Sequence, residues 1–98
     1  MRLEDFEWDP AKALANLEKH GVSFEEAATI FSDWRHATWP DVLHSTNEDR
    51  FITIGLSERR RLLTVSHTDR DETIRIISAR EATRAERRRY EENLDSSH

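Results

Sequence analysis

Two arginines near the end of the chain are the residues best suited to chemistry. Arg75 opens the run Arg75-Ile76-Ile77-Ser78-Ala79-Arg80, which has the composition of a buried strand, and Arg80 stands at its exit. A guanidinium stays charged at physiological pH and offers a planar fork of donors that matches phosphate or carboxylate oxygens. Both arginines therefore predict an anionic partner, which is either a bound anion or an acidic side chain of this chain.

Histidines are the candidates for proton transfer. His20 falls in the last turn of a predicted helix, where a cation complements the helix dipole, so a capping role is favoured. His44 and Glu48 would supply two ligands of a metal site, but no third ligand lies nearby and no metal or other cofactor is predicted. His67 is the preferred candidate, although strict alternation places it on the core side, opposite to Arg75, unless a bulge or an edge position intervenes.

Length and composition indicate one small folded domain. The chain has 98 residues, 36% of them hydrophobic, and no cysteine, which excludes disulfides and thiolate metal sites. No apolar run approaches the roughly 20 residues of a membrane span, and no signal-peptide pattern is visible. We expect a single domain over residues 1–98, located in the cytoplasm, with a frayed tail at 95–98.

The charge is distributed unevenly along the chain. The net charge is −5, yet residues 1–49 hold 4 basic and 11 acidic side chains, whereas residues 50–98 hold 11 basic and 9 acidic ones. All the basic residues of the second half are arginines. This pattern is typical of an acidic shoulder beside a local arginine site, and it disfavours direct binding to duplex DNA.

Helix signals stand at both ends of the sequence. Asp9 and Pro10 are start signals and Gly21 is a stop signal, which predicts a helix over 10–19. Ser23 with Glu26 forms a capping-box pattern for a second helix, whose core stripe is Phe24, Ala27, Ala28 and Phe31. Thr83 with Glu86 repeats that pattern and predicts a last helix reaching about 93. The arginine run 87–89 has the composition of an RNA-binding element, but a solvated face is favoured over direct phosphate contact, since acids three or four residues away can pair with it.

Alternation of apolar residues predicts four strands, over 35–39, 50–57, 62–67 and 72–78. Short connections make these strands antiparallel neighbours. The predicted core side carries Ile52, Ile54, Leu56, Leu63, Val65, Ile74 and Ile76. Arg75 then lies on the opposite, polar face with Thr53, Thr64 and Ser66. The expected fold class is α+β: two N-terminal helices, a four-stranded mainly antiparallel sheet and one C-terminal helix.

An ordered set of residues resembles the BrnT toxin family. It consists of Phe6-x-Trp8-Asp9-x-x-Lys12-x-x-x-Asn16, Lys19-His20-Gly21-Val22-x-Phe24-x-Glu26-Ala27, Glu48-x-Arg50, Gly55, the run from Arg75 to Arg80, and Glu86-Arg87-x-x-Tyr90. The resemblance implies the toxin of a type II toxin–antitoxin pair, with a fold similar to RelE-type ribonucleases. It also implies a BrnA-like ribbon-helix-helix antitoxin as partner, an RNA substrate, and contact with operator DNA only through the antitoxin. It leaves open a dimer within the toxin–antitoxin complex.

Chemistry and placement, rather than the resemblance, assign roles to single residues. In metal-independent RNA cleavage a base takes the 2′-hydroxyl proton, and cations stabilise the charge that develops on the phosphoryl oxygens. We assign the stabilisation of that negative charge to Arg75 and Arg80, with Arg60 as a third cation. The predicted acid and base are His67 and Glu48. RNA binding is assigned to Arg50 and Arg60, and to Tyr90, which could stack a base or donate a proton.

Two function classes remain at this level. The first is a ribonuclease toxin that inhibits translation and whose antitoxin covers the active face. The second is a non-catalytic binding module that acts only by capturing a partner, since fold does not settle activity. The two differ in whether an RNA product forms.

Overall fold

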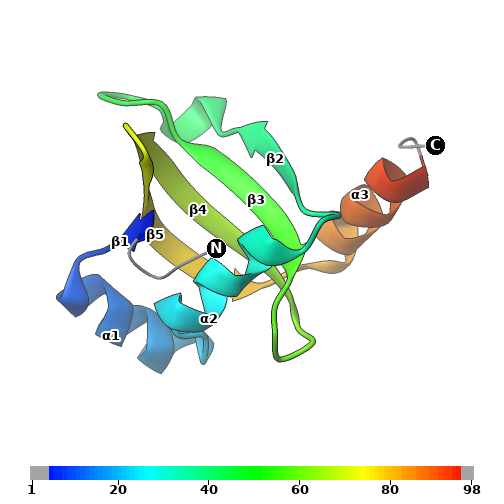
Figure 1. Ribbon diagram of the computed structural model, residues 1–98, viewed down its shortest axis with the longest axis horizontal. Helices are drawn as coiled ribbons and strands as arrows, with labels where there is room; N and C mark the ends of the chain where they lie inside the picture. Colours follow the sequence, from blue (N-terminus) through cyan, green and yellow to red (C-terminus); the bar gives the residue numbers. More distant parts are fainter. Residues whose placement is uncertain (1–4, 96–98) are drawn as a thin grey trace.

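The computed structural model describes residues 5–95 (Figure 1). Its elements, in chain order, are β1 (Phe6–Glu7), α1 (Pro10–His20), α2 (Phe24–Thr29), the 3₁₀ turn η2 (Ile30–Ser32), β2 (Ala37–Pro40), the 3₁₀ turn η3 (Val42–His44), β3 (Phe51–Leu56), β4 (Leu62–Arg70), β5 (Thr73–Glu81) and α3 (Arg84–Asp95). The α+β class is confirmed. Of the predicted frayed tail, residues 96–98 lie outside the described part of the chain, and Asp95 ends α3.

The predicted helix boundaries are confirmed by the caps that form. The Asp9 side chain accepts a hydrogen bond from the backbone N–H of Ala11, and Gly21 adopts the left-handed conformation with φ 69°. Ser23 accepts from the backbone N–H of Glu26 at the start of α2. At α3 the capping box is complete, because Thr83 and Glu86 each accept a hydrogen bond from the other's backbone N–H.

The strands form one five-stranded sheet in the order β1-β5-β4-β3-β2. The prediction of four strands was wrong in number, because the short β1 adds to β5 in parallel through the pairs Phe6–Ile74 and Glu7–Arg75. All other neighbours are antiparallel, as predicted. A two-residue strand carries no alternation pattern of its own, so only its partner reveals it.

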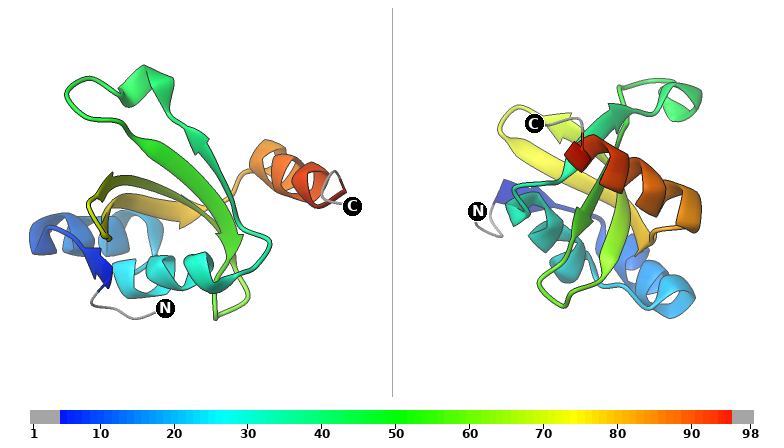
Figure 2. Two further views of the ribbon diagram at one scale, coloured as in Figure 1. Left: turned by 45° about the horizontal axis from the view of Figure 1, so that its top comes forward. Right: turned by 90° about the vertical axis from the view of Figure 1, so that its right-hand side faces the viewer.

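Both faces of the sheet are covered, although unequally. On one face, α1 and α2 enclose the larger core, in which Phe24 and Ile30 pack with Leu63, Val65 and Ile76. On the other face, α3 lies toward one end of the sheet, as the two views of Figure 2 show. There Tyr90 packs with Ile54 and Leu62 in a second, smaller cluster. We call the side of the sheet that α3 contacts the α3 face.

The predicted assignment of faces was wrong for β3. Thr53 pairs with Val65 and Gly55 pairs with Leu63, and directly paired residues share a face, so Thr53 and Gly55 point toward α2. Ile52 and Ile54 consequently lie on the α3 face. Gly55 fits against η2 because it lacks a side chain: a Cβ there would lie 3.0 Å from the Cβ of Ile30. The alternation was real, but apolar residues cover both faces of this strand.

A β-bulge decides the faces of β5. Ser66 pairs with Ser78 and His67 pairs with Ile76, so Ile77 is an extra residue on β5. Because of it, Ile76 and Ala79 both reach the larger core. Arg75 pairs with Thr68 and Arg80 pairs with Thr64, which places both arginines on the α3 face.

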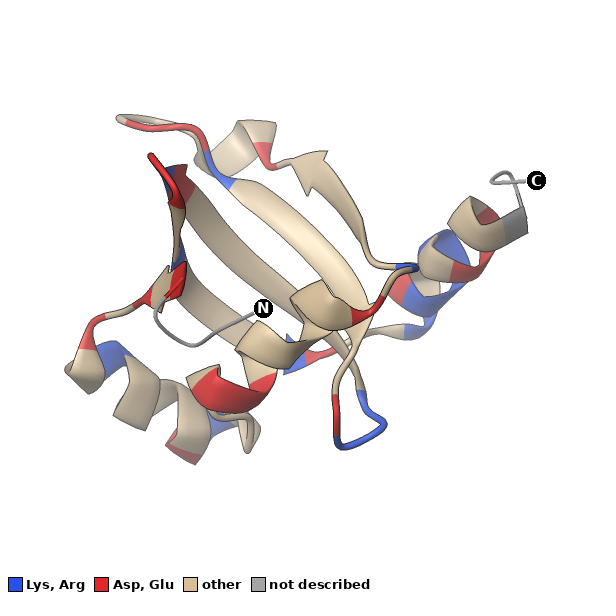
Figure 3. Ribbon diagram, viewed as in Figure 1, with Lys and Arg blue, Asp and Glu red and all other residues tan. Residues whose placement is uncertain are grey.

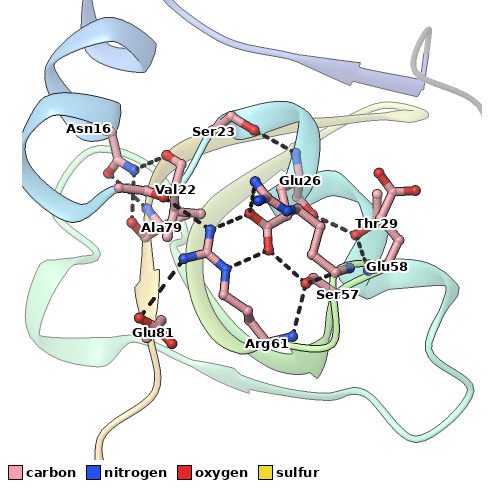
Figure 4. A network of polar contacts seen from close by, with 12 residues as sticks. Asn16, Val22, Ser23, Glu26, Thr29, Ser57, Glu58, Arg61, Ala79 and Glu81 are labelled. Carbon is pink, nitrogen blue, oxygen red and sulfur yellow. Dashed lines mark hydrogen bonds and ion pairs between the residues drawn. The ribbon is translucent and has the colours of Figure 1, made fainter.

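Buried polar contacts fasten α1 and α2 to the sheet (Figure 4). Glu26 is 3% exposed, and its carboxylate accepts hydrogen bonds from Arg61 and from the Ser57 hydroxyl. The Arg61 hydrogen bond is the main reason that the pKa of Glu26 lies below its usual value. Asn16 of α1 bonds both the N–H and the C=O of Ala79 in β5. These contacts hold α1 and α2 on the sheet and do not involve side chains of the α3 face.

Candidate functional site

The part of the α3 face that α3 does not cover is polar. It carries Ser66 and Thr68 on β4, Arg75 and Ser78 on β5, and Arg50 immediately before β3. Four of these side chains are partly exposed, and Thr68 is buried, with a hydroxyl that has no hydrogen-bond partner among residues 5–95. We call these five residues the open end. Arg75 was predicted to share a face with Thr64 and Ser66, and this is confirmed. Thr53, which was predicted on the same face, lies on the opposite one.

Arg75 is held only loosely by the rest of the protein. Its guanidinium Nη1 lies 3.8 Å from Oε1 of Glu7 in β1, and the Arg75 side chain is 32% exposed. Such a long, partly solvated ion pair stabilises a fold by at most about 1 kcal/mol. The guanidinium can therefore exchange Glu7 for an incoming anion.

Arg50 is the second cation of the open end. It precedes β3, and because Phe51 pairs with His67, continuing that register by one residue sets Arg50 opposite Thr68. Thr68 in turn pairs with Arg75, so β4 alone separates the two arginines. With strands about 4.8 Å apart, their backbones lie roughly 10 Å from each other. Within residues 5–95 the Arg50 guanidinium has no ion pair, which leaves its fork of donors available.

An aspartate–histidine pair borders the open end. The backbone N–H of Asp41 donates to the carbonyl of Arg50 at 2.8 Å, which extends the β2–β3 ladder by one rung. In the η3 turn that follows, Nδ1 of His44 lies 2.8 Å from Oδ2 of Asp41. The Asp41 side chain is 12% exposed and that of His44 is 66% exposed. The sequence prediction considered His44 among the histidines able to transfer protons and, with Glu48, as a metal ligand, but it missed this pair, although an Asp three residues before a His at a strand end was the available signal.

Arg80 lies on the same face as Arg75, but its guanidinium is fully engaged. Its two Nη atoms donate to the two carboxylate oxygens of Glu86, at 2.7 and 2.9 Å. Glu86 also accepts from the Thr64 hydroxyl at 3.0 Å. The hydrogen bonds from Arg80, with those from Thr83 and Thr64, lower the pKa of Glu86 to about 2. Arg80 and Arg75 are five residues apart on β5, roughly 15 Å, so they do not converge on one phosphate.

His67 does not join this face. It lies on the core face with 2% exposure, where Nε2 is 2.7 Å from the Thr53 hydroxyl and Nδ1 is 3.0 Å from Asp69. Its ring stacks on Phe51 at 5.9 Å. Burial lowers the pKa of His67, and Asp69 opposes part of that effect. A bulge on β4 would have turned His67 toward Arg75, but the bulge lies on β5. The buried His67 ring therefore cannot contact an RNA that binds on the α3 face.

Three other predicted site residues lie apart from one another. Glu48 forms an ion pair with Arg70 at 3.3 Å, in the loop that follows η3. Arg60 is exposed in the β3–β4 turn, where its φ is 65°. Tyr90 is 7% exposed, and its hydroxyl donates to Asp33 at 2.6 Å; burial, together with that hydrogen bond, raises the pKa of Tyr90 to about 12. Tyr90 thus anchors α3, and its buried ring cannot stack on a base.

Other arginines gather away from the open end. In the ribbon of Figure 3, Lys and Arg positions are concentrated on α3 and on the β3–β4 turn, with acidic positions among them. Arg89 of α3 lies 3.8 Å from the ring centroid of Trp39. No group of three or more His, Cys, Asp or Glu within residues 5–95 could hold a metal ion. No helix in that part of the chain is long and apolar enough to cross a membrane.

Comparison with known proteins decides the family. Residues 8–86 match the model of the family described as "Ribonuclease toxin, BrnT, of type II toxin-antitoxin system". The chain belongs to this family. Its members are ribonuclease toxins, and the resemblance to BrnT that the sequence indicated is thereby confirmed.

A solved BrnT structure supports the same conclusion. The crystal structure of the Brucella abortus ribonuclease toxin BrnT matches with a TM-score of 0.60 and 25% sequence identity, over 79% of this chain and 94% of that chain. No curated protein sequence matches the chain. The family gives a BrnT toxin an antitoxin partner and an RNA substrate.

Proposed function

We propose that this BrnT-family protein is a metal-independent endoribonuclease whose open end binds the RNA backbone. The observation that carries the proposal is the strand register, which sets Arg75 opposite Thr68 on one side of β4 and, when continued by one residue beyond Phe51, sets Arg50 opposite Thr68 on the other side. Two guanidinium forks on either side of Thr68 suit one phosphodiester, because each fork can donate two hydrogen bonds to its oxygens.

The proposed reaction is attack of a 2′-hydroxyl on the adjacent phosphorus. Negative charge then grows on the non-bridging oxygens, and cations already in place stabilise it more than they stabilise the substrate. In this proposal Arg75 and Arg50 supply those cations. Arg80 acts indirectly, because its bidentate bond to Glu86 holds the start of α3 against the sheet.

The same surface is the proposed docking site of the antitoxin. An acidic partner segment gains most where guanidinium groups lack an internal carboxylate, and Arg50 meets that condition within the described chain. We propose a BrnA-like partner with a ribbon-helix-helix part that supplies the operator contacts, since a toxin with a net charge of −5 is poorly suited to bind duplex DNA. Cleavage of cellular RNA would inhibit translation and would place the toxin's action in the cytoplasm.

RNA cleavage by the purified chain tests the function. Incubation with end-labelled RNA in excess EDTA should give products that end in a 2′,3′-cyclic phosphate and begin with a 5′-hydroxyl. Arg50→Ala should weaken RNA binding and cleavage, whereas Arg88→Ala, an exposed arginine of α3, is the matched control and should change neither. An intact RNA at confirmed solubility, with tight capture of the partner, would favour the non-catalytic module instead.

Expression in cells tests the partner. The chain alone should arrest growth, and co-expression of the antitoxin should restore it. The complex should bind operator DNA with an affinity that falls steeply with salt, and the toxin alone should not. A complex that still cuts RNA at the rate of the free toxin would contradict the shared surface.

A further inference from the structure

We infer that His44, oriented by Asp41, is the general base of RNA cleavage. The inference rests on the proposed function and adds a residue and a role to the open end. Three observations carry it: the hydrogen bond within the pair, the free outer nitrogen of the imidazole, and the position of the pair beside Arg50.

The hydrogen bond fixes which nitrogen of His44 can accept a proton. A carboxylate only accepts hydrogen bonds, so the 2.8 Å contact between Nδ1 of His44 and Oδ2 of Asp41 requires the proton on Nδ1. The lone pair of the neutral imidazole then lies on Nε2. Within residues 5–95 nothing bonds to Nε2, and the side chain is 66% exposed. This is the arrangement in which a carboxylate orients a histidine base and stabilises the cation that forms.

The backbone of η3 holds the pair in place. The carbonyl of Asp41 accepts a hydrogen bond from the backbone N–H of His44 at 3.3 Å. It also accepts one from the Ser45 hydroxyl at 2.8 Å, and Ser45 in turn accepts from the backbone N–H of Arg50 at 2.9 Å. The loop is thus closed onto the end of β3, which limits the motion of the imidazole relative to Arg50.

The position of the pair matches the geometry that the reaction needs. Asp41 extends the β2–β3 ladder opposite Arg50, so its backbone stands one strand spacing, about 5 Å, from that of the arginine proposed to bind the phosphate, and its carboxylate holds the His44 ring. A ribose whose phosphate lies between Arg50 and Arg75 can therefore present its 2′-hydroxyl toward His44. The other candidate bases are engaged elsewhere: His67 is buried on the core face, and the Glu48 carboxylate is paired with Arg70.

The step balances without an external reagent other than water. Nε2 of His44 takes the 2′-hydroxyl proton as the 2′ oxygen forms a bond to phosphorus. The bond from phosphorus to the 5′ oxygen breaks, and that oxygen takes a proton from water. The products are a 2′,3′-cyclic phosphate and a 5′-hydroxyl, and His44 releases its proton to solvent. Nothing is oxidised or reduced.

Substitution of His44 tests the role in the full-length chain. His44→Gln should lower kcat at least about 10²-fold, as removal of a general base does. The Kd for a non-cleavable RNA with 2′-O-methyl groups should change less than twofold. His20→Gln removes a histidine in the last turn of α1 and is the matched control, with kcat expected to remain that of wild type. Added imidazole should restore part of the activity of His44→Ala, which a merely structural role would not permit.

A double-mutant cycle tests the positioning role of Asp41. Asp41→Asn should lower kcat about tenfold in the wild-type background and leave it unchanged in the His44→Ala background, because the carboxylate acts only through the imidazole. Equal losses in both backgrounds would overturn that role. Full activity of His44→Gln on an RNA that wild type cleaves would overturn the inference and leave the proposed function standing. Failure of wild type to cleave RNA would overturn both.

Discussion

Replacement of Glu86 by Gln should destabilise the fold in a pH-dependent way. Glu86 lies at the centre of the contacts that fasten α3 to the sheet, because it bonds Arg80 through both oxygens and also accepts from the Thr64 hydroxyl. A glutamine keeps the shape and some hydrogen bonds but removes the charge. The variant therefore isolates the electrostatic part of the attachment.

The pKa of Glu86 sets the magnitude. A carboxyl whose pKa falls from 4.5 to about 2, mainly through the Arg80 hydrogen bonds, has its ionised form stabilised by at most about 3.4 kcal/mol. Arg80 is 41% exposed, so solvent screens the pair, and we expect about 1–2 kcal/mol at pH 7. Because the folded-state pKa is depressed, this stabilisation is present above pH 4.5 and is lost as the pH falls toward 2.

Urea unfolding at several pH values measures the effect. At pH 7 the Glu86→Gln variant should unfold at lower urea, by about 1–2 kcal/mol, and the gap to wild type should shrink between pH 4.5 and 2.5. Glu91→Gln, an exposed acid on the same helix, is the control and should change the free energy of unfolding by less than about 0.5 kcal/mol. A gap that is absent at pH 7, or that is unchanged at pH 2.5, would refute the ion-pair account.

Three further results are expected. Arg75→Ala should lower RNA cleavage about 10²-fold with an unchanged melting temperature, since the Arg75 side chain makes only a 3.8 Å ion pair. Arg75→Lys should retain part of the cleavage that Arg75→Ala loses. A loss of melting cooperativity would show a structural role instead. As the pH is lowered from 6.5, the free energy of unfolding should decrease by up to about 1.4 kcal/mol per pH unit. The reason is that burial lowers the pKa of His67 in the folded chain, so the unfolded chain takes up the proton first. His67→Gln should flatten that slope in denaturant titrations. Gly55→Ala should reduce stability by about 1–3 kcal/mol in calorimetry, because its Cβ would lie 3.0 Å from the Cβ and 3.1 Å from the carbonyl oxygen of Ile30; an unchanged melting temperature would mean that η2 yields without strain.

The sequence by itself determined the local structure of this protein. Asp9, Gly21 and the pair Thr83 and Glu86 act on backbone groups within four residues of themselves, so their effect does not depend on what packs against them. The four longer strands were also visible, since alternation is a property of neighbouring residues. The family was visible too, because its motif residues occur in a fixed order along most of the chain.

Only the tertiary structure decided which residues share a face. In β3 both alternating sets are buried, one under α2 and the other under α3, so alternation alone could not tell core from site. The bulge at Ile77 changes the faces of β5 without any glycine or proline to announce it. Whether each arginine has an ion-pair partner also depended on the tertiary structure. Arg80 pairs with Glu86 of the following helix, whereas Arg50 has no ion pair within the described chain.

The candidate base shows the same division. Asp41 and His44 are three residues apart, so their hydrogen bond is local, and the sequence contained it. Its position beside the arginines depends on strand pairing. The β2–β3 register sets Asp41 opposite Arg50, and the pairing of β4 with β5 sets Arg75 opposite Thr68. Hydrogen bonds between backbones far apart in sequence set those positions, and the local patterns around Asp41, Arg50 and Arg75 do not reveal which residues pair across the strands.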